Sequence, residues 1–180
     1  MADELLDVVD EQGTVIGTAM KSECHRNPAL IHPVVHCWVF NSAGQVLLQQ
    51  CSLQKQLAPG MWDVSGGGHV GSGEHPDDAI LRELEEELGV TGVRPIWVTK
   101  QLFRYPTQTE LTYVYFLLLD RPAESFSLEE DEVSAVRWYD IQTLVEAVHS
   151  GEIQSTSFYR THLQATLQHI AAQYFQLTHS

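Results

Sequence analysis

The stretch Gly68–Val90, GHVGSGEHPDDAILRELEEELGV, decides the fold of this chain. Pro76 suits the first turn of a helix, where its missing N–H costs nothing. Gly89 suits the left-handed backbone position that ends a helix. The residues between them are mostly strong helix formers and make about three and a half turns. We therefore predict a helix that begins near Pro76 and ends near Gly89.

The apolar residues of this predicted helix lie on one side. At a helical spacing they fall within an arc of about 100°, wide enough to form a stripe that faces a core. The stripe consists of Ile80, Leu81, Leu84 and Leu88. The sequence therefore predicts that the helix packs against a sheet or another helix.

Three acids form a second pattern on the same helix. Glu83, Glu86 and Glu87 are spaced i, i+3, i+4, so they project together, and like charges at this spacing repel by a few tenths of a kcal/mol each. A hard divalent cation such as Mg²⁺ or Mn²⁺ would neutralise them. The alternative is an ordinary acidic helix face in water. Glu74 offers a further carboxylate, and Arg82 can brace the acids by bidentate contacts.

The whole segment resembles the Nudix box, which specifies residues at fixed spacings. Every specified position is matched, and the matches are Gly68, Glu74, Arg82, Glu83, Leu84, Glu86, Glu87, Gly89 and Val90. The resemblance implies that Glu83, Glu86 and Glu87 bind divalent metal. It also implies that Glu74 supports the metal site and that Arg82 orients a glutamate.

Strand patterns surround this helix. Runs rich in β-branched and aromatic residues predict strands at 5–9, 15–18, 31–41, 45–50, 62–65, 96–103, 111–120 and 133–139. Two further helices are expected, one from Asp140 to near Gly151 and one at 157–176. We predict one α/β domain over residues 1–180, an α/β/α sandwich around a mixed sheet, which is the fold that the Nudix resemblance implies.

Three consecutive glycines, Gly66, Gly67 and Gly68, precede the helix. We predict a glycine-rich loop there, in which backbone N–H groups of Gly67 and Gly68 approach a phosphate. The segment is not a Walker A loop, because no Gly-Lys-Ser/Thr follows it.

Composition limits the partners. The chain has 180 residues and a formal net charge of −14, with 10 Lys and Arg against 24 Asp and Glu. Long nucleic acid is a poor partner for such a surface, whereas a small phosphorylated substrate escorted by Mg²⁺ or Mn²⁺ is compatible. Three cysteines argue against a disulfide framework. We see neither a secretory signal nor a membrane span, so we expect a cytoplasmic protein, and a homodimer is left open.

Outside the box, the chain is similar to the isopentenyl-diphosphate isomerase branch of the Nudix superfamily. In that branch histidines and glutamates outside the helix hold a metal. The resemblance implies that His25, His32, His69 and Glu110 do so here, although a second expected glutamate falls near Gln108. It also implies that Lys21, Lys55 and Arg82 contact a diphosphate, while one expected arginine is Cys51.

Two departures count against isomerisation. The isomerase has a catalytic cysteine where this chain has Gly67, and its Nudix helix is degraded, whereas all acids are present here. We therefore predict a metal-dependent Nudix hydrolase that cleaves a diphosphate joined to a group X. An isomerase-like enzyme and a non-catalytic module that senses a diphosphate or nucleotide are the alternatives.

Some residues keep two interpretations. Glu86, Glu87 and Glu110 are equivalent candidates for the general base, and Glu110 could instead be an ordinary acid at a strand end. His36 is expected to be a core histidine. The histidines expected at the surface of the C-terminal helices and tail are His149, His162, His169 and His179.

Overall fold

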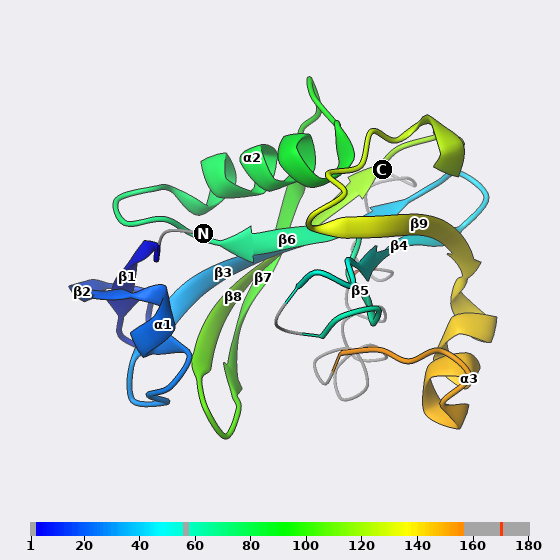
Figure 1. Cartoon of the computed structure of the whole chain (residues 1–180). Coiled ribbons are helices and arrows are strands. Elements are labelled where there is room, and N and C mark those ends of the chain that lie inside the picture. The colour runs from blue at the N-terminus through cyan, green and yellow to red at the C-terminus, as the bar shows by residue number, and fades with distance from the viewer. Residues whose placement is uncertain (1–2, 56–57, 157–169, 171–180) are drawn as a thin grey trace.

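The computed structural model describes residues 3–55, 58–156 and 170. Within these residues nine strands form one sheet. The strands are β1 (Leu5–Val9), β2 (Val15–Met20), β3 (Ile31–Phe40), β4 (Gln45–Cys51), β5 (Trp62–Asp63), β6 (Gly66–His69), β7 (Ile96–Arg104), β8 (Thr109–Leu118) and β9 (Val133–Asp140). The α-helices are α1 (Lys21–Cys24), α2 (Pro76–Leu88) and α3 (Ile141–Ser150), and a 3₁₀ turn spans Ala123–Ser125 (Figure 1).

Strand β3 is the centre of the sheet. It pairs antiparallel with β1, β4 and β6, and it pairs parallel with β8 over ten residues, from Ile31 opposite Thr109 to Phe40 opposite Leu118. β7 lies outside β8, and β9 lies outside β4. One parallel pair among antiparallel pairs makes this the mixed sheet that the sequence predicted.

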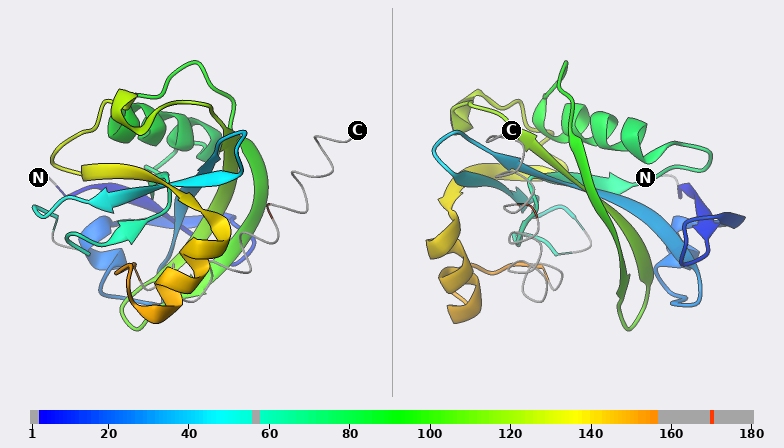
Figure 2. Two further views of the ribbon diagram at one scale, coloured as in Figure 1. Left: turned by 90° about the vertical axis from the view of Figure 1, so that its right-hand side faces the viewer. Right: turned by 180° about the vertical axis from the view of Figure 1, so that it is seen from behind.

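Helices cover both faces of the sheet, as Figure 2 shows from two sides. The apolar side chains of α2 pack on one face with Val35, Cys37 and Val39 of β3. Leu144 and Val148 of α3 pack on the other face in a cluster that includes Trp38. Alternate residues of β3 therefore pack against helices on opposite faces of the sheet. The predicted α/β/α sandwich is confirmed.

The ends of α2 also follow the sequence. Pro76 occupies its first turn, and Gly89 ends it in the left-handed conformation with φ of 63°. Ile80, Leu84 and Leu88 are buried as predicted. Leu81 was placed in the core stripe by its position on the helix, but this prediction is wrong, because its side chain is 40% exposed at the edge of the packed face.

The predicted glycine-rich loop is also wrong, because Gly66–His69 forms strand β6. Its residues pair antiparallel with β3, from Cys37 opposite Gly66 to Val34 opposite His69. Glycine weakens an isolated strand through its entropy, so propensity favoured a loop. Here the ladder with β3 outweighs that preference, and the missing side chains let other elements approach the backbone closely.

Other predictions differ in detail. Strand 62–65 is shorter than expected and ends at Asp63. The predicted helix 157–176 lies outside the described residues, apart from Ile170, which is 1% exposed in the core beside α3. His162, His169 and His179 also lie outside them, and His149 is exposed as expected. Among the helices of the described part of the chain, none has the length and apolarity to span a membrane.

The end of α2 gives a test of the fold. We expect Gly89→Ala to lower the free energy of unfolding by roughly 1–2 kcal/mol, because a β-carbon destabilises the left-handed conformation. That β-carbon would also lie 2.7 Å from Cβ of Ser127. Gly17→Ala is the control, since its β-carbon meets no atom within 4 Å. Urea denaturation compares the two variants, and equal midpoints would contradict the role of Gly89.

Candidate functional site

Arg82 joins the acids of α2 to the rest of the site. Its Nε and Nη2 donate to the two carboxylate oxygens of Glu74, at 2.9 and 3.0 Å. Its Nη1 donates to Glu83 at 2.8 Å and to Glu86 at 3.0 Å. Nη2 also donates to the backbone carbonyl of His69 at 3.0 Å. Arg82 therefore ties the helix to the preceding loop and to the end of β6, which fits its predicted role in orienting glutamates.

Glu87 is the most deeply buried of the three acids, with 3% of its surface exposed. One carboxylate oxygen accepts the backbone N–H of Gly67 at 3.0 Å. The side-chain amide of Gln49 lies 3.2 and 3.3 Å from the two oxygens. Burial raises the pKa of Glu87 to about 8, and the charge of Glu83 adds to that rise. The site thus holds a carboxyl group whose ionised form needs a nearby cation.

The glycines of β6 make room for these acids. A β-carbon on Gly68 would lie 2.3 Å from Oε1 of Glu83, and one on Gly66 would lie 3.1 Å from Leu84. The N–H of Gly67, which the sequence assigned to a phosphate, is donated to Glu87 instead. Burial raises the pKa of Glu83, while Arg82 opposes that rise. The glycines therefore serve close packing of α2 against β6.

Three histidines meet on the other side of β6. Nε2 of His25 lies 2.9 Å from Nε2 of His69, and the ring centroids of the three pairs are 5.0–5.5 Å apart. One ligand atom from each of His25, His32 and His69 lies within 4.8 Å of the others. They come from the end of α1, from β3 and from β6, so the fold brings His69 against His25, which lies 44 residues earlier in the chain.

The state of these histidines fits a metal site. Both ring nitrogens of His32 are buried, and neither has a hydrogen-bond partner of ordinary distance and angle among the described residues. Burial lowers the pKa of His32 to about 4, and it also lowers the pKa of His25 and His69. Neutral imidazoles with free nitrogen lone pairs are the form that binds metals.

The candidate ligands form two groups rather than one. Gly66 and Gly68 face α2, so the alternation of a strand directs His69 to the opposite face. The carboxylate group consists of Glu83, Glu86 and Glu87, and the histidine group consists of His25, His32 and His69. The spacing of these residues in the sequence does not show that the carboxylate group and the histidine group lie on opposite sides of β6. The backbone of β6 separates them.

Glu110 and the lysines complete the predicted set. Glu110 of β8 lies opposite His32 of β3 in register, so both point to the histidine side of the sheet. Gln108 donates a hydrogen bond to Glu110, and burial raises the pKa of that carboxyl to about 7. Lys21 pairs with Glu4 at 3.4 Å, and Lys55 pairs with Glu132 at 2.7 Å. Both lysines lower the pKa of His69, so their charges reach the histidine group.

Comparison with known proteins identifies the family. The model of the NUDIX domain matches residues 30–161. The chain belongs to the Nudix family. It is 32% identical over 157 residues to isopentenyl-diphosphate Delta-isomerase of Citrobacter koseri, covering 82% of this chain and 83% of that protein. It is also 32% identical over 154 residues to an uncharacterised Nudix hydrolase of Clostridium acetobutylicum, covering 80% and 73%.

Solved structures agree with the Nudix fold. The crystal structure of DR0079 from Deinococcus radiodurans matches with a TM-score of 0.77 and 25% identity, covering 90% of this chain and 98% of that one. The fold of this Nudix chain is therefore that of a solved structure.

Gly67 stands where the isomerase has its catalytic cysteine, and the structure leaves no room for that side chain. A β-carbon there would lie 2.4 Å from the carbonyl oxygen of Val35 and 2.9 Å from Cδ2 of His36. His36, predicted to be a core residue, is partly buried in β3 opposite Gly67, and burial lowers its pKa to about 4. The space that a cysteine side chain would need is filled by β3.

Sequence reasoning missed Gln49, the amide partner of Glu87. It is 5% exposed and follows the apolar run Val46–Leu48 of β4. A polar residue at a buried strand position was the available signal, since buried amides need hydrogen-bond partners.

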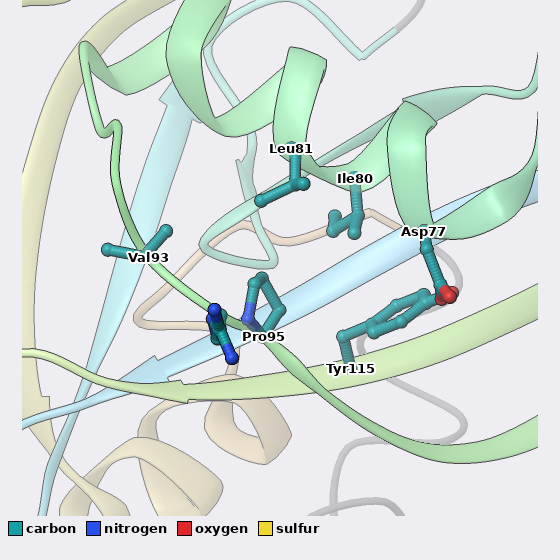
Figure 3. Close-up of a pocket in the computed structure, with 7 residues that line it drawn as sticks. Asp77, Ile80, Leu81, Val93, Pro95 and Tyr115 are labelled. Atoms are coloured by element: carbon teal, nitrogen blue, oxygen red, sulfur yellow. The ribbon is translucent and has the colours of Figure 1, made fainter.

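A separate hollow lies between α2 and the start of β7. It is lined by Asp77, Ile80, Leu81, Val93, Arg94, Pro95 and Tyr115 (Figure 3). The hydroxyl of Tyr115 donates to Asp77 at 2.6 Å. The residues of the carboxylate and histidine groups do not line this hollow, so it is not part of the candidate site.

Position 67 tests the isomerase alternative. We expect Gly67→Cys to produce no isomerisation of isopentenyl diphosphate and to lower the urea midpoint, because its β-carbon would overlap the β3 backbone. Nuclear magnetic resonance of the products and urea denaturation measure the two effects. A variant that keeps the original midpoint and forms dimethylallyl diphosphate would refute this steric exclusion.

Proposed function

We propose that this protein is a metal-dependent Nudix hydrolase that cleaves the diphosphate linkage of a substrate in which a diphosphate is joined to a group X. The observation that carries the proposal is the carboxylate group on α2, in which the buried Glu87, 3% exposed, lies within electrostatic range of the partly buried Glu83, while Glu86 is exposed beside them. Burying carboxylates together is costly unless a cation pairs with them. The intact box and the Nudix family support the same reading.

Mg²⁺ or Mn²⁺ is the proposed cofactor. Glu83, Glu86 and Glu87 would hold it with hard oxygen ligands. A bound divalent cation would neutralise charge on the diphosphate and lower the pKa of water. Glu74 makes its hydrogen bonds to Arg82 and to the N–H of Gly71 at 2.8 Å. We therefore propose that Glu74 supports the site through Arg82 rather than by direct ligation.

The chain supplies positive charge for the diphosphate from Lys21 and Lys55. Each now pairs with a carboxylate, Glu4 or Glu132. Both ion pairs are partly exposed, and ion pairs at the surface are worth about 0–1 kcal/mol, so a diphosphate can compete for the lysines. Glu87 and Glu110 have pKa values raised to about 8 and about 7, near the pH at which a general base works best. Glu86 remains a third candidate base.

An isomerase is the second candidate, because the histidine group is complete and a relative named as that isomerase is 32% identical. The contact of Gly67 with β3 counts against it. A non-catalytic sensing module is disfavoured by the retention of all box acids. For a small phosphorylated substrate, the charge of −14 presents no obstacle once a cation accompanies it.

Glu87 gives the main test of the proposal. We expect Glu87→Gln to reduce kcat for Mg²⁺- or Mn²⁺-dependent diphosphate cleavage by on the order of 100-fold or more, since a preorganised charge is lost. Glu85→Gln is the matched control, because Glu85 is exposed on the same helix. A panel of diphosphates, with products read by mass, measures turnover. Undiminished turnover in Glu87→Gln would reject the assignment.

The histidine group needs a test that does not depend on activity. We expect Zn²⁺, which imidazole ligands suit better than carboxylates, to stabilise the protein by about 2.7 kcal/mol at about 100 times its Kd. His32→Leu should remove most of that gain, whereas His149→Leu, at an exposed position on α3, should keep it. Thermal unfolding with and without metal measures the difference. An equal metal-dependent rise in all three proteins would argue against ligation by His32.

A further inference from the structure

Asp7 of β1 is a buried carboxylate that belongs to neither metal group, and only 9% of its surface is exposed. Its two oxygens accept separate hydrogen bonds from the turn at residues 71–73, which leads into α2. Oδ1 accepts the hydroxyl of Ser72 at 2.7 Å, and Oδ2 accepts the backbone N–H of Gly73 at 3.0 Å. These partners lie 65 and 66 residues later in the chain, so the contact joins the β1–β2 hairpin to the Nudix box.

The backbone of β1 also contacts this turn. Leu6 forms an isolated β-bridge with Gly71, and the N–H of Ser72 donates to the carbonyl oxygen of Leu5 at 3.1 Å. These contacts place the turn against β1, whereas the carboxylate of Asp7 fixes the last two residues of the turn. Because the backbone contacts do not need a carboxylate at position 7, its loss should loosen the turn without unfolding the sheet.

Glu74 follows the turn directly and is oriented by it. The backbone N–H of Glu74 donates to the carbonyl oxygen of Gly71 at 3.0 Å, and its Oε2 accepts the N–H of Gly71 at 2.8 Å. The same carboxylate accepts two hydrogen bonds from Arg82, which also donates to two acids of the carboxylate group. A continuous run of hydrogen bonds therefore extends from Asp7, through the turn and Glu74, to Arg82 and the carboxylate group.

The direction of the Arg82 guanidinium depends on this support. A guanidinium is planar, so the two bonds to Glu74 set its plane and direct Nη1 toward Glu83 and Glu86. A displaced Glu74 would turn this plane and leave the acids in a poorer geometry for a cation. Partners that orient metal ligands typically change metal affinity by about 10–100-fold when they are lost.

We propose that Asp7 is a positioning residue, which holds the turn 71–73 so that Glu74 and Arg82 keep the carboxylate group in its metal-binding geometry. This inference rests on the proposed metal-dependent function and adds to it a residue from outside the Nudix box. The competing role for Asp7 is stabilisation of the fold alone.

Binding of Mn²⁺ tests this role without turnover. Electron paramagnetic resonance measures free Mn²⁺, and the bound Mn²⁺ that excess Mg²⁺ displaces reports the carboxylate group, because Mg²⁺ prefers oxygen ligands to imidazoles. We expect Asp7→Ala to weaken this displaceable binding by about tenfold, at the low end of the usual range because Asp7 acts through other residues. Asp7→Asn should stay within about twofold of the wild type, since an amide can accept the N–H of Gly73 and donate to the Ser72 hydroxyl.

Asp10→Ala is the matched control. The carboxylate of Asp10 accepts the backbone N–H groups of Gln12 and Thr14 at 2.9 and 2.8 Å, and both bonds lie within the β1–β2 turn. This variant loses two hydrogen bonds of the same hairpin and should keep the Mn²⁺ affinity of the wild type. Wild-type affinity in Asp7→Ala, or a loss in Asp10→Ala or Asp7→Asn equal to that in Asp7→Ala, would overturn the proposal.

Ser72→Ala decides the test if Asp7→Ala does not fold, as circular dichroism would show. It removes one of the two bonds to Asp7 and should weaken displaceable Mn²⁺ binding by about threefold; in that case an unchanged affinity would overturn the role of Asp7.

The hydrolase function is judged by a separate measurement. If the wild-type protein binds displaceable Mn²⁺ but cleaves no diphosphate, the proposed hydrolase fails, while the affinities of the variants still decide the role of Asp7. Absence of displaceable Mn²⁺ from the wild-type protein would overturn the positioning role itself.

Discussion

The narrow space around strand β6 is the constraint on which the site depends. Strand β6 pairs with β3 and packs against α2 very closely. A β-carbon added at Gly66, Gly67 or Gly68 would lie 3.1, 2.4 or 2.3 Å from the nearest heavy atom. On one side this closeness lets Glu83 pack against β6 and lets Glu87 accept the N–H of Gly67. On the other side His69 joins two histidines from other elements. Both groups of candidate ligands exist because this strand carries no side chain until its last residue.

Much of the fold could be predicted from the sequence, because its signals are local. The period of α2, the proline in its first turn and the glycine at its end identified the helix almost to the residue. Alternating and β-branched runs located most strands. The contact of Arg82 with Glu86 could also be predicted, since the two residues are four positions apart on the helix.

The rest depends on contacts between distant residues. No property of three glycines indicates that β3 will pair with them, and propensity favours a loop. The 40% exposure of Leu81 depends on which parts of the chain cover the helix, and the helical period alone does not give them. The separation of the carboxylates from the histidines depends on the face to which His69 points, which the register with Val34 sets. Gln49 reaches its partner Glu87, 38 residues later in the chain, only in the folded protein.

Because β6 separates the carboxylate group from the histidine group, the two groups would prefer different metal ions. Carboxylates are hard oxygen donors that suit magnesium, calcium and manganese, whereas imidazoles are borderline donors that suit zinc, copper, iron and nickel. The three cysteines, which are the soft donors of the chain, are buried, and burial raises the pKa of each thiol. They therefore do not compete for the ions. One polypeptide thus presents two donor sets of different chemical hardness, so its metal content would vary with the ions supplied during its preparation.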